Sequence, residues 1–157
     1  MPISRKYSRK QILVVDDDPD SCEMLAVFLT SHDFDVVTAA TVSAGLALVR
    51  QHRFDLHVLD WHFPDGNGPA LCQQMGALDT PLVIWSSDAQ EETRQQALST
   101  GAAAFFTKPI DLDRFLVVVQ QLTQDAGQAI DSATRPTQEQ WSYTAFNAWW
   151  APSLEFR

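Results

Sequence analysis

Long hydrophobic runs and cysteines are both scarce in this chain of 157 residues. No apolar run approaches the roughly 18–20 residues that span a bilayer, so we expect no membrane insertion. The basic start is followed by an apolar run that is too short for a secretory signal. The two cysteines, Cys22 and Cys72, cannot form a metal site, and no histidine spacing completes one. We expect both to be buried, reduced side chains in the cytoplasm.

Positive charge is scarce beyond the first ten residues. Those residues carry four of the 11 Lys and Arg side chains and no acid. Because the whole chain has a net charge of −9, the remaining residues carry −13 once those four charges are subtracted. An acidic body of this kind repels phosphate backbones, which argues against direct nucleic-acid binding. Residues 1–10 are interpreted as a basic N-terminal arm that frays into solvent.

The sequence alternates short apolar runs with longer helical patterns. Five runs have the near-continuous hydrophobicity that is typical of parallel strands buried on both faces. The predicted strands are residues 12–15, 35–38, 56–59, 82–85 and 103–106. The first predicted helix begins at Asp18-Pro19-Asp20, and the other four span residues 43–52, 68–77, 90–100 and 111–124. Five βα units predict a flavodoxin-like, doubly wound five-stranded parallel sheet in strand order 2-1-3-4-5, within a three-layer α/β sandwich with a C-terminal extension.

Two of the helical patterns indicate which side chains face the core. In the first helix we expect Asp18 to cap the N-terminus and Pro19 to occupy the first helical position. The predicted inward faces are Cys22, Leu25, Phe28 and Leu29 in the first helix, and Phe115, Leu116, Val119 and Leu122 in the last.

Polar side chains stand where four of the apolar runs end: Asp16 and Asp17, Asp60, Ser86 and Lys108. The strand ends of a doubly wound sheet meet at one edge, where ligands bind near the switch point. Three carboxylates at that edge would be costly to ionise together without a cation, and Mg²⁺ or Mn²⁺ prefers such oxygen ligands. A carboxylate can also attack phosphorus and form an acyl phosphate. The other acids of the first loop, Asp18 and Asp20, are interpreted as helix-capping residues.

The order acid pair, acid, hydroxyl, Lys-Pro over residues 11–125 resembles the receiver domain of two-component response regulators. The resemblance implies that Asp60, in an Asp-x-x-x-Pro pattern followed by glycine, is the phosphoacceptor. It also implies that Asp16, Asp17 and Asp60 hold Mg²⁺ together with the backbone carbonyl of His62.

The resemblance assigns the remaining site residues as well. Ser86 and Lys108 would bind the phosphoryl group, Ser86 and Phe105 would form the switch, and the Lys108–Pro109 bond is a candidate cis peptide. Ser86 stands 22 residues before Lys108, and this spacing favours Ser86 by resemblance to the family. Phe105 cannot make the hydrogen bond of a tyrosine, so we expect a differently tuned switch, and a role as a core aromatic stays open.

The implied function is that of a phosphoacceptor response regulator in a two-component phosphorelay. A sensor histidine kinase or a histidine phosphotransfer protein would donate the phosphoryl group, with no dedicated small-molecule turnover. The 32 residues after Asp125 are too few for a further domain with its own core, so we expect a stand-alone receiver that signals to a downstream protein partner. A fragment of a longer protein is equally compatible with the sequence.

Two other classes of function stay open at this point. A degenerate receiver would bind proteins independently of phosphorylation. Such a protein would be marked by the loss of an acid, the lysine or the hydroxyl of the site, and all of these are present here. A haloacid-dehalogenase-like phosphatase would use Asp16 as its nucleophile within Asp-x-Asp. That interpretation leaves Asp60 without a role, and the later acids Asp111 and Asp113 open a helix instead of following another strand.

The end of the chain differs in composition from the rest. Residues 126–140 are predicted to be a linker, and residues 141–157 hold six of the 16 aromatic side chains. The interaction tail includes Trp141, Tyr143, Phe146, Trp149 and Trp150. Two interpretations stay open: an extra helix packed on its own domain, or docking on a partner or a second copy. A homodimer is expected through this tail or through the face of the fourth helix, fifth strand and fifth helix.

Overall fold

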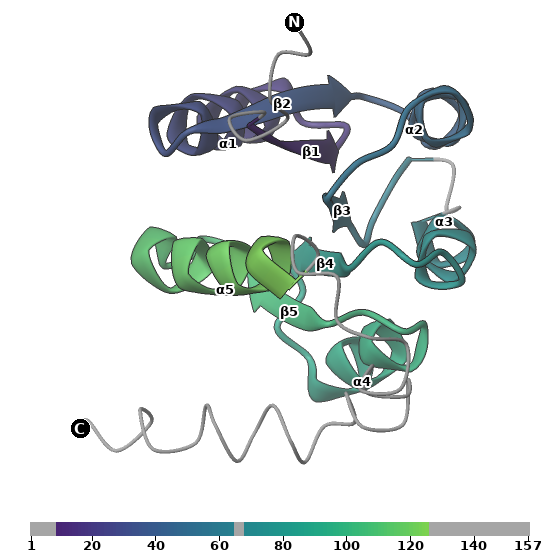
Figure 1. Ribbon diagram of the computed structural model, residues 1–157. Coiled ribbons are helices and arrows are strands. Elements are labelled where there is room, and N and C mark those ends of the chain that lie inside the picture. Colours follow the sequence, from purple (N-terminus) through teal and green to yellow (C-terminus); the bar gives the residue numbers. More distant parts are fainter. Residues whose placement is uncertain (1–8, 65–67, 126–157) are drawn as a thin grey trace, which may run out of the picture. The chain divides into compact units, whose positions relative to one another are not determined.

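A computed structural model describes residues 9–64 and 68–125 (Figure 1). The predicted linker and aromatic tail lie outside the described residues. One parallel sheet is formed by β1 (Lys10–Val15), β2 (Phe34–Ala39), β3 (Leu56–Asp60), β4 (Leu82–Ser86) and β5 (Ala104–Thr107). The strand order is β2-β1-β3-β4-β5, which confirms the predicted topology.

In the described part of the chain, five helices cover the two faces of this sheet. They are α1 (Pro19–Ser31), α2 (Val42–Gln51), α3 (Gly68–Gly76), α4 (Glu91–Ser99) and α5 (Leu112–Asp125). Figure 1 shows α1 and α5 on one face and α2, α3 and α4 on the other, so the three-layer prediction is confirmed. None of the helices in the described ranges is long and apolar enough to cross a membrane.

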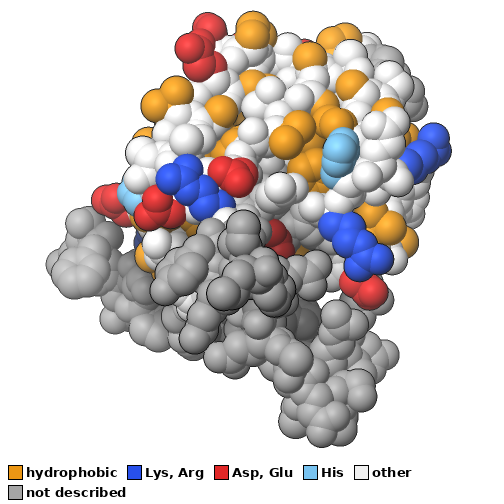
Figure 2. Space-filling model, turned by 45° about the horizontal axis from the view of Figure 1, so that its top comes forward, with side chains coloured by type: hydrophobic (Ala, Val, Ile, Leu, Met, Phe, Trp, Pro, Cys, Tyr) orange, Lys and Arg blue, Asp and Glu red, His pale blue; other side chains and the backbone are white. Residues whose placement is uncertain are grey.

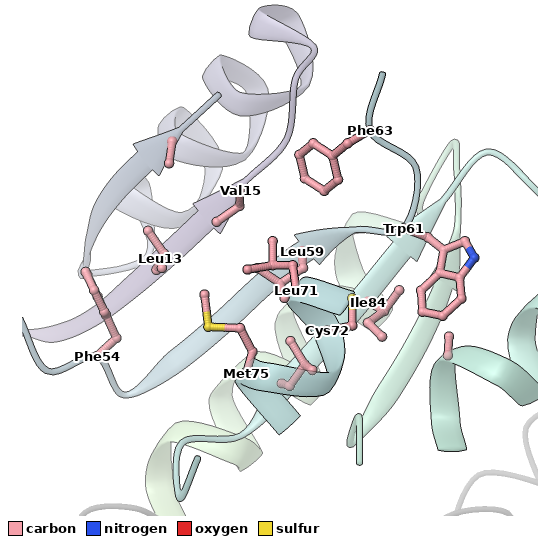
Figure 3. Close-up of a cluster of buried hydrophobic side chains, with 13 residues drawn as sticks. Leu13, Val15, Phe54, Leu59, Trp61, Phe63, Leu71, Cys72, Met75 and Ile84 are labelled. Carbon is pink, nitrogen blue, oxygen red and sulfur yellow. The ribbon is translucent and has the colours of Figure 1, made fainter. Parts of the chain in front are cut away.

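The core is built from strands buried on both faces. Every residue of β3 and β4 is buried. On the face covered by α2, α3 and α4, side chains of β1, β3 and β4 pack against α3 (Figure 3). The labelled members from these elements are Leu13, Val15, Leu59, Ile84, Leu71, Cys72 and Met75. Cys22 and Cys72 are both free and buried, as predicted.

The helix ends and inward faces follow the sequence pattern with two corrections. Asp18 caps α1, because its carboxylate accepts hydrogen bonds from the backbone N–H groups of residues 20 and 21. Phe28 in α1 is only half-buried. In α5, Leu116 is half-buried and Val118 is buried in its place. Val118 belongs to the i, i+3, i+4, i+7 stripe that starts at Phe115, whereas Leu116 lies at the margin of that stripe.

The surface carries few large apolar side chains. The most exposed in the described ranges is Val27 of α1, at 65%. On the face drawn in Figure 2, hydrophobic side chains lie in small groups among polar and charged ones. Most large apolar side chains of the described residues are therefore at least partly buried.

Candidate functional site

The carboxyl ends of four neighbouring strands bring the predicted site residues together. Asp16 follows β1, Asp60 and Ser86 end β3 and β4, and Lys108 follows β5. These ends meet at one edge because the strands are parallel and adjacent. Asp16 and Ser86 are fully buried and Asp60 is 6% exposed. Asp17 is exposed.

The Lys108 ammonium lies close to both buried carboxylates, Asp16 and Asp60. Its Nζ donates a hydrogen bond to Asp16 Oδ2 at 2.7 Å and lies 3.6 Å from Asp60 Oδ1. The same ammonium lies 4.2 Å from the ring centroid of Trp85. The Lys108–Pro109 peptide bond is cis, the geometry that the resemblance implies. The Lys108 N–H donates to the Ser86 carbonyl at 2.7 Å, which ties the end of β5 to that of β4.

The three acids form a cluster suited to a cation. One carboxylate oxygen from each of Asp16, Asp17 and Asp60 lies within 4.8 Å of the others. Burial, and then the charge of Asp16, raises the pKa of Asp60 to about 6, while Lys108 opposes that shift. A divalent cation would offset the same penalties, and three hard oxygen donors match its preference. The residues present therefore fit Mg²⁺ or Mn²⁺.

A fourth acid, Asp88, lies next to the Ser86 hydroxyl. Ser86 Oγ accepts a hydrogen bond from the Asp88 backbone N–H at 3.1 Å. Asp88 Oδ2 accepts from Thr93 Oγ1 at 2.7 Å and lies 3.7 Å from Nε2 of His62. The hydrogen bond from Thr93 is the main cause that lowers the pKa of Asp88. Sequence reasoning missed Asp88; the available signal was an acid shortly before a predicted helix.

The loop between β3 and α3 carries the His62 backbone close to Asp60. The His62 N–H points to Asp60 Oδ1 at 3.5 Å, and its ring is exposed. A Cβ at Gly68 would lie 2.0 Å from the Trp61 carbonyl oxygen, so only glycine allows this approach of loop and helix. The metal-binding role of the His62 carbonyl stays a prediction.

Two residues of β4 and β5 complete the surroundings. Phe105 pairs with Ile84, is half-buried and packs against the core cluster. That position accounts for a core aromatic, and its switch role stays a prediction. From the sequence, Trp85 is predicted only to be part of a buried strand. Its contact with Lys108 joins β4 to the residue that follows β5, and the sequence offers no signal for such a contact.

Known proteins are similar to this chain over the same region. The family described as "Response regulator receiver domain" matches residues 12–120. The response regulator protein PilR of Pseudomonas aeruginosa is 37% identical over 114 residues, which cover 71% of this chain and 26% of PilR. The transcriptional regulatory protein KdpE of Mycobacterium tuberculosis is 34% identical over 106 residues, which cover 67% of this chain and 47% of KdpE. The matched part thus spans less than half the length of either relative.

Solved structures show the same fold. A CheY-like response regulator receiver domain protein from Methanospirillum hungatei superposes with a TM-score of 0.71 and 27% identity, covering 76% of this chain and 98% of that one. The receiver domain of the Francisella response regulator 1452 has a TM-score of 0.70, with 75% and 99% coverage. Its identity of 24% supports a likeness of fold alone.

Proposed function

Because this chain belongs to the response regulator receiver domain family of two-component systems, we propose that Asp60 accepts a phosphoryl group. The observation that carries this proposal is the setting of the Asp60 carboxylate. It is nearly buried, lies 3.6 Å from the Lys108 ammonium, and shares an acidic cluster with Asp16 and Asp17. A lysine ammonium and a carboxylate cluster that can hold a divalent cation, both beside one buried carboxylate, are what a transferred phosphoryl group requires.

In the proposed step, a carboxylate oxygen of Asp60 forms a bond to phosphorus. The P–N bond of a phosphohistidine breaks, its electron pair goes to the imidazole nitrogen, and a proton from solvent neutralises the departing ring. The donor is a sensor histidine kinase or a histidine phosphotransfer protein. The product is an acyl phosphate, a mixed anhydride that water hydrolyses slowly, so the group acts as a timed signal.

Asp16, Asp17, Asp60 and the His62 carbonyl are the groups that we propose hold Mg²⁺ or Mn²⁺. When bound, the cation supplies positive charge to the attacking carboxylate and the phosphoryl oxygens. Lys108 donates to a phosphoryl oxygen on Asp60. The Ser86 hydroxyl does the same: its oxygen already accepts from the Asp88 N–H, which leaves its own proton available.

The output that we propose is a protein–protein contact. Ser86 and Lys108 stand at the ends of β4 and β5, so a movement of either toward the phosphoryl group would bias the face of α4, β5 and α5 between two arrangements. Phe105 on β5 is the candidate switch aromatic. The partner is a downstream cytoplasmic protein, and the acidic body argues against nucleic acid.

Intact-mass analysis after treatment with acetyl phosphate and Mg²⁺ tests this function. The wild type should gain one phosphoryl group and Asp60→Ala none, whereas Asp55→Ala, a matched change just before β3, should still gain it. No gain in the wild type would favour a degenerate, phosphorylation-independent binding module. A phosphoryl group mapped to Asp16 would favour the phosphatase class.

We further propose that residues 141–157 are an association segment, because their composition concentrates aromatic side chains. Deleting residues 138–157 should lower the solution mass of an assembly, measured by light scattering with and without acetyl phosphate. A monomer before and after deletion, in both conditions, would contradict the proposal.

A further inference from the structure

Trp85 is a buried aromatic residue beside the site that the proposed function leaves without a role. It is 1% exposed and pairs in register with Asp60 on the neighbouring strand. Directly paired residues of parallel strands project from the same face, so the indole lies beside the Asp60 carboxylate. The Lys108 ammonium lies 4.2 Å from the ring centroid. The indole thus borders both a reactive group and its cation.

Packing alone does not account for tryptophan at this position. Its Nε1 is buried and has no hydrogen-bond partner within the described part of the chain. A buried donor without a partner is unfavourable, and phenylalanine or leucine would fill the core without it. Tryptophan instead offers the ring face that attracts a cation most strongly. The Lys108 side chain is 21% exposed, so the ring acts on a partly desolvated ammonium.

The ring contact also differs in kind from the other contacts of Lys108. The hydrogen bond to Asp16 Oδ2 is directed, and it holds the ammonium closer to Asp16 than to Asp60. A ring face has no single acceptor atom, so its attraction persists while the ammonium shifts across it. A phosphoryl group on Asp60 would draw the ammonium away from Asp16. Trp85 is the register partner of Asp60 on the neighbouring strand, so its ring is attached beside the end point of that movement.

We propose that Trp85 is a positioning residue whose indole face holds the Lys108 ammonium over the site. The ring stays in contact with the ammonium during its passage, the movement from Asp16 to a phosphoryl group on Asp60. The passage rests on the proposed function. The ring contact in the unphosphorylated protein does not, so the two parts are tested separately.

Lysine NMR of the full-length protein without metal tests the ring contact. The chain contains only three lysines, Lys6, Lys10 and Lys108, so ε-¹³C-lysine labelling yields three signals, and Lys108→Arg assigns the third. Ring currents should move the Lys108 ε-methylene protons upfield of the other two. Trp85→Phe should retain part of this shift and Trp85→Leu should lose it. A Lys108 signal that matches those of Lys6 and Lys10 would overturn the proposal.

Phosphorylation kinetics with acetyl phosphate and Mg²⁺ test the passage. Trp85→Leu should slow the reaction roughly 3- to 30-fold, and Trp85→Phe should recover much of the rate. Phe106→Leu is the matched control, because Phe106 pairs with Trp85 and packs 5.4 Å from the ring of Phe115, centroid to centroid. It perturbs the same core but should react at the wild-type rate. Equal rates for Trp85→Leu and the wild type would overturn the passage.

Fluorinated tryptophan keeps the test decisive if Trp85→Leu does not fold. Replacing all tryptophan with 5-fluorotryptophan weakens the ring face with little change of shape. It should slow the wild type but not Trp85→Phe, which controls for the other tryptophans. The same slowing in both proteins would overturn the proposal. A wild type that gains no phosphoryl group would overturn the proposed function, and the lysine shift would still decide the ring contact.

Discussion

Asp60 and His57 are buried titratable side chains on the same strand, β3, and they have opposite surroundings. They are 6% and 2% exposed. Asp60 lies near the Lys108 ammonium and the His62 N–H, whereas Nδ1 of His57 has no hydrogen-bond partner within the described ranges. Burial, followed by the charge of Asp16, raises the pKa of Asp60 to about 6, and burial lowers that of His57 to about 4.

The difference shows when a buried titratable group indicates function. Burial opposes the charged form of both side chains. Only Asp60 has a neighbouring cation and further carboxylates with which a metal could be shared. His57 instead packs with its ring centroid 5.9 Å from that of Phe54 and behaves as a neutral core residue. A perturbed pKa therefore marks a candidate site only where the neighbouring groups compensate the charge.

Removing the cation beside Asp60 should have the largest effect. Lys108→Met leaves two buried carboxylates without their partner, so the metal-free protein should lose about 3 kcal/mol of unfolding free energy at pH 7. Phosphorylation by acetyl phosphate should slow at least about 100-fold. Urea unfolding and intact-mass kinetics measure the two. The matched control is Lys10→Met, because Lys10 lies 3.8 Å from the Asp55 carboxylate at the surface. Its loss should stay below about 1 kcal/mol, and equal losses would contradict the prediction.

Removing the titration of His57 should have the next largest effect. Its folded pKa of about 4 lies below the unfolded value of 6.5, so its contribution to stability is present above pH 6.5 and is lost as the pH falls toward 4. His57→Phe should lack this loss. In urea unfolding, its advantage over the wild type should grow by about 2 kcal/mol between pH 6.5 and 5, as part of about 3.4 kcal/mol over the whole pH range of the titration. His32→Phe, at an exposed position, serves as the control, and an unchanged difference across this range would show that His57 is not the titrating group.

Removing the charge of Asp60 should have a slightly smaller effect over its whole range. Its folded pKa of about 6 exceeds the unfolded value of 3.8, so its contribution to stability is present below pH 3.8 and is lost as the pH rises to 6. Asp60→Asn cannot ionise and should be up to about 3 kcal/mol more stable than the wild type at pH 8 with a chelator present. The gain should shrink as the pH falls. Added Mg²⁺ should stabilise the wild type more than the variant, and parallel pH profiles would contradict this account.

The smallest effect should come from Asp88, an acid near the same sheet edge that is not deeply buried. Its pKa is lowered mainly by the Thr93 hydroxyl. Thr93→Val should therefore raise the pKa of the Asp88 carboxyl toward its ordinary value, and Thr93→Ser should keep it low. Carboxyl ¹³C NMR titration measures both. An unchanged value in Thr93→Val would assign the shift to the Gln90 N–H, which donates to Asp88 Oδ1 at 2.9 Å.

Much of the fold and the candidate site could be predicted because both depend on where strands end. A run such as residues 12–15 is apolar throughout because it is buried on both faces, and the first polar residue after it marks the sheet edge. Every predicted strand and helix is present within two residues of its expected bounds. The shift of the inward face of α5 from Leu116 to Val118 was missed, because the margin of an apolar stripe depends on how the helix rotates against the sheet.

The sequence by itself determined the parallel sheet, its strand order and the set of polar residues at its edge, because these follow from local hydrophobicity and from the handedness of chain connections. Only the tertiary structure decided which partner each group has. It put Lys108 against Asp16 and over Trp85 and paired Asp88 with Thr93. Among the described residues it left Nδ1 of His57 without a hydrogen-bond partner. Such contacts join residues from different elements, and their distances depend on side-chain packing that no local pattern encodes.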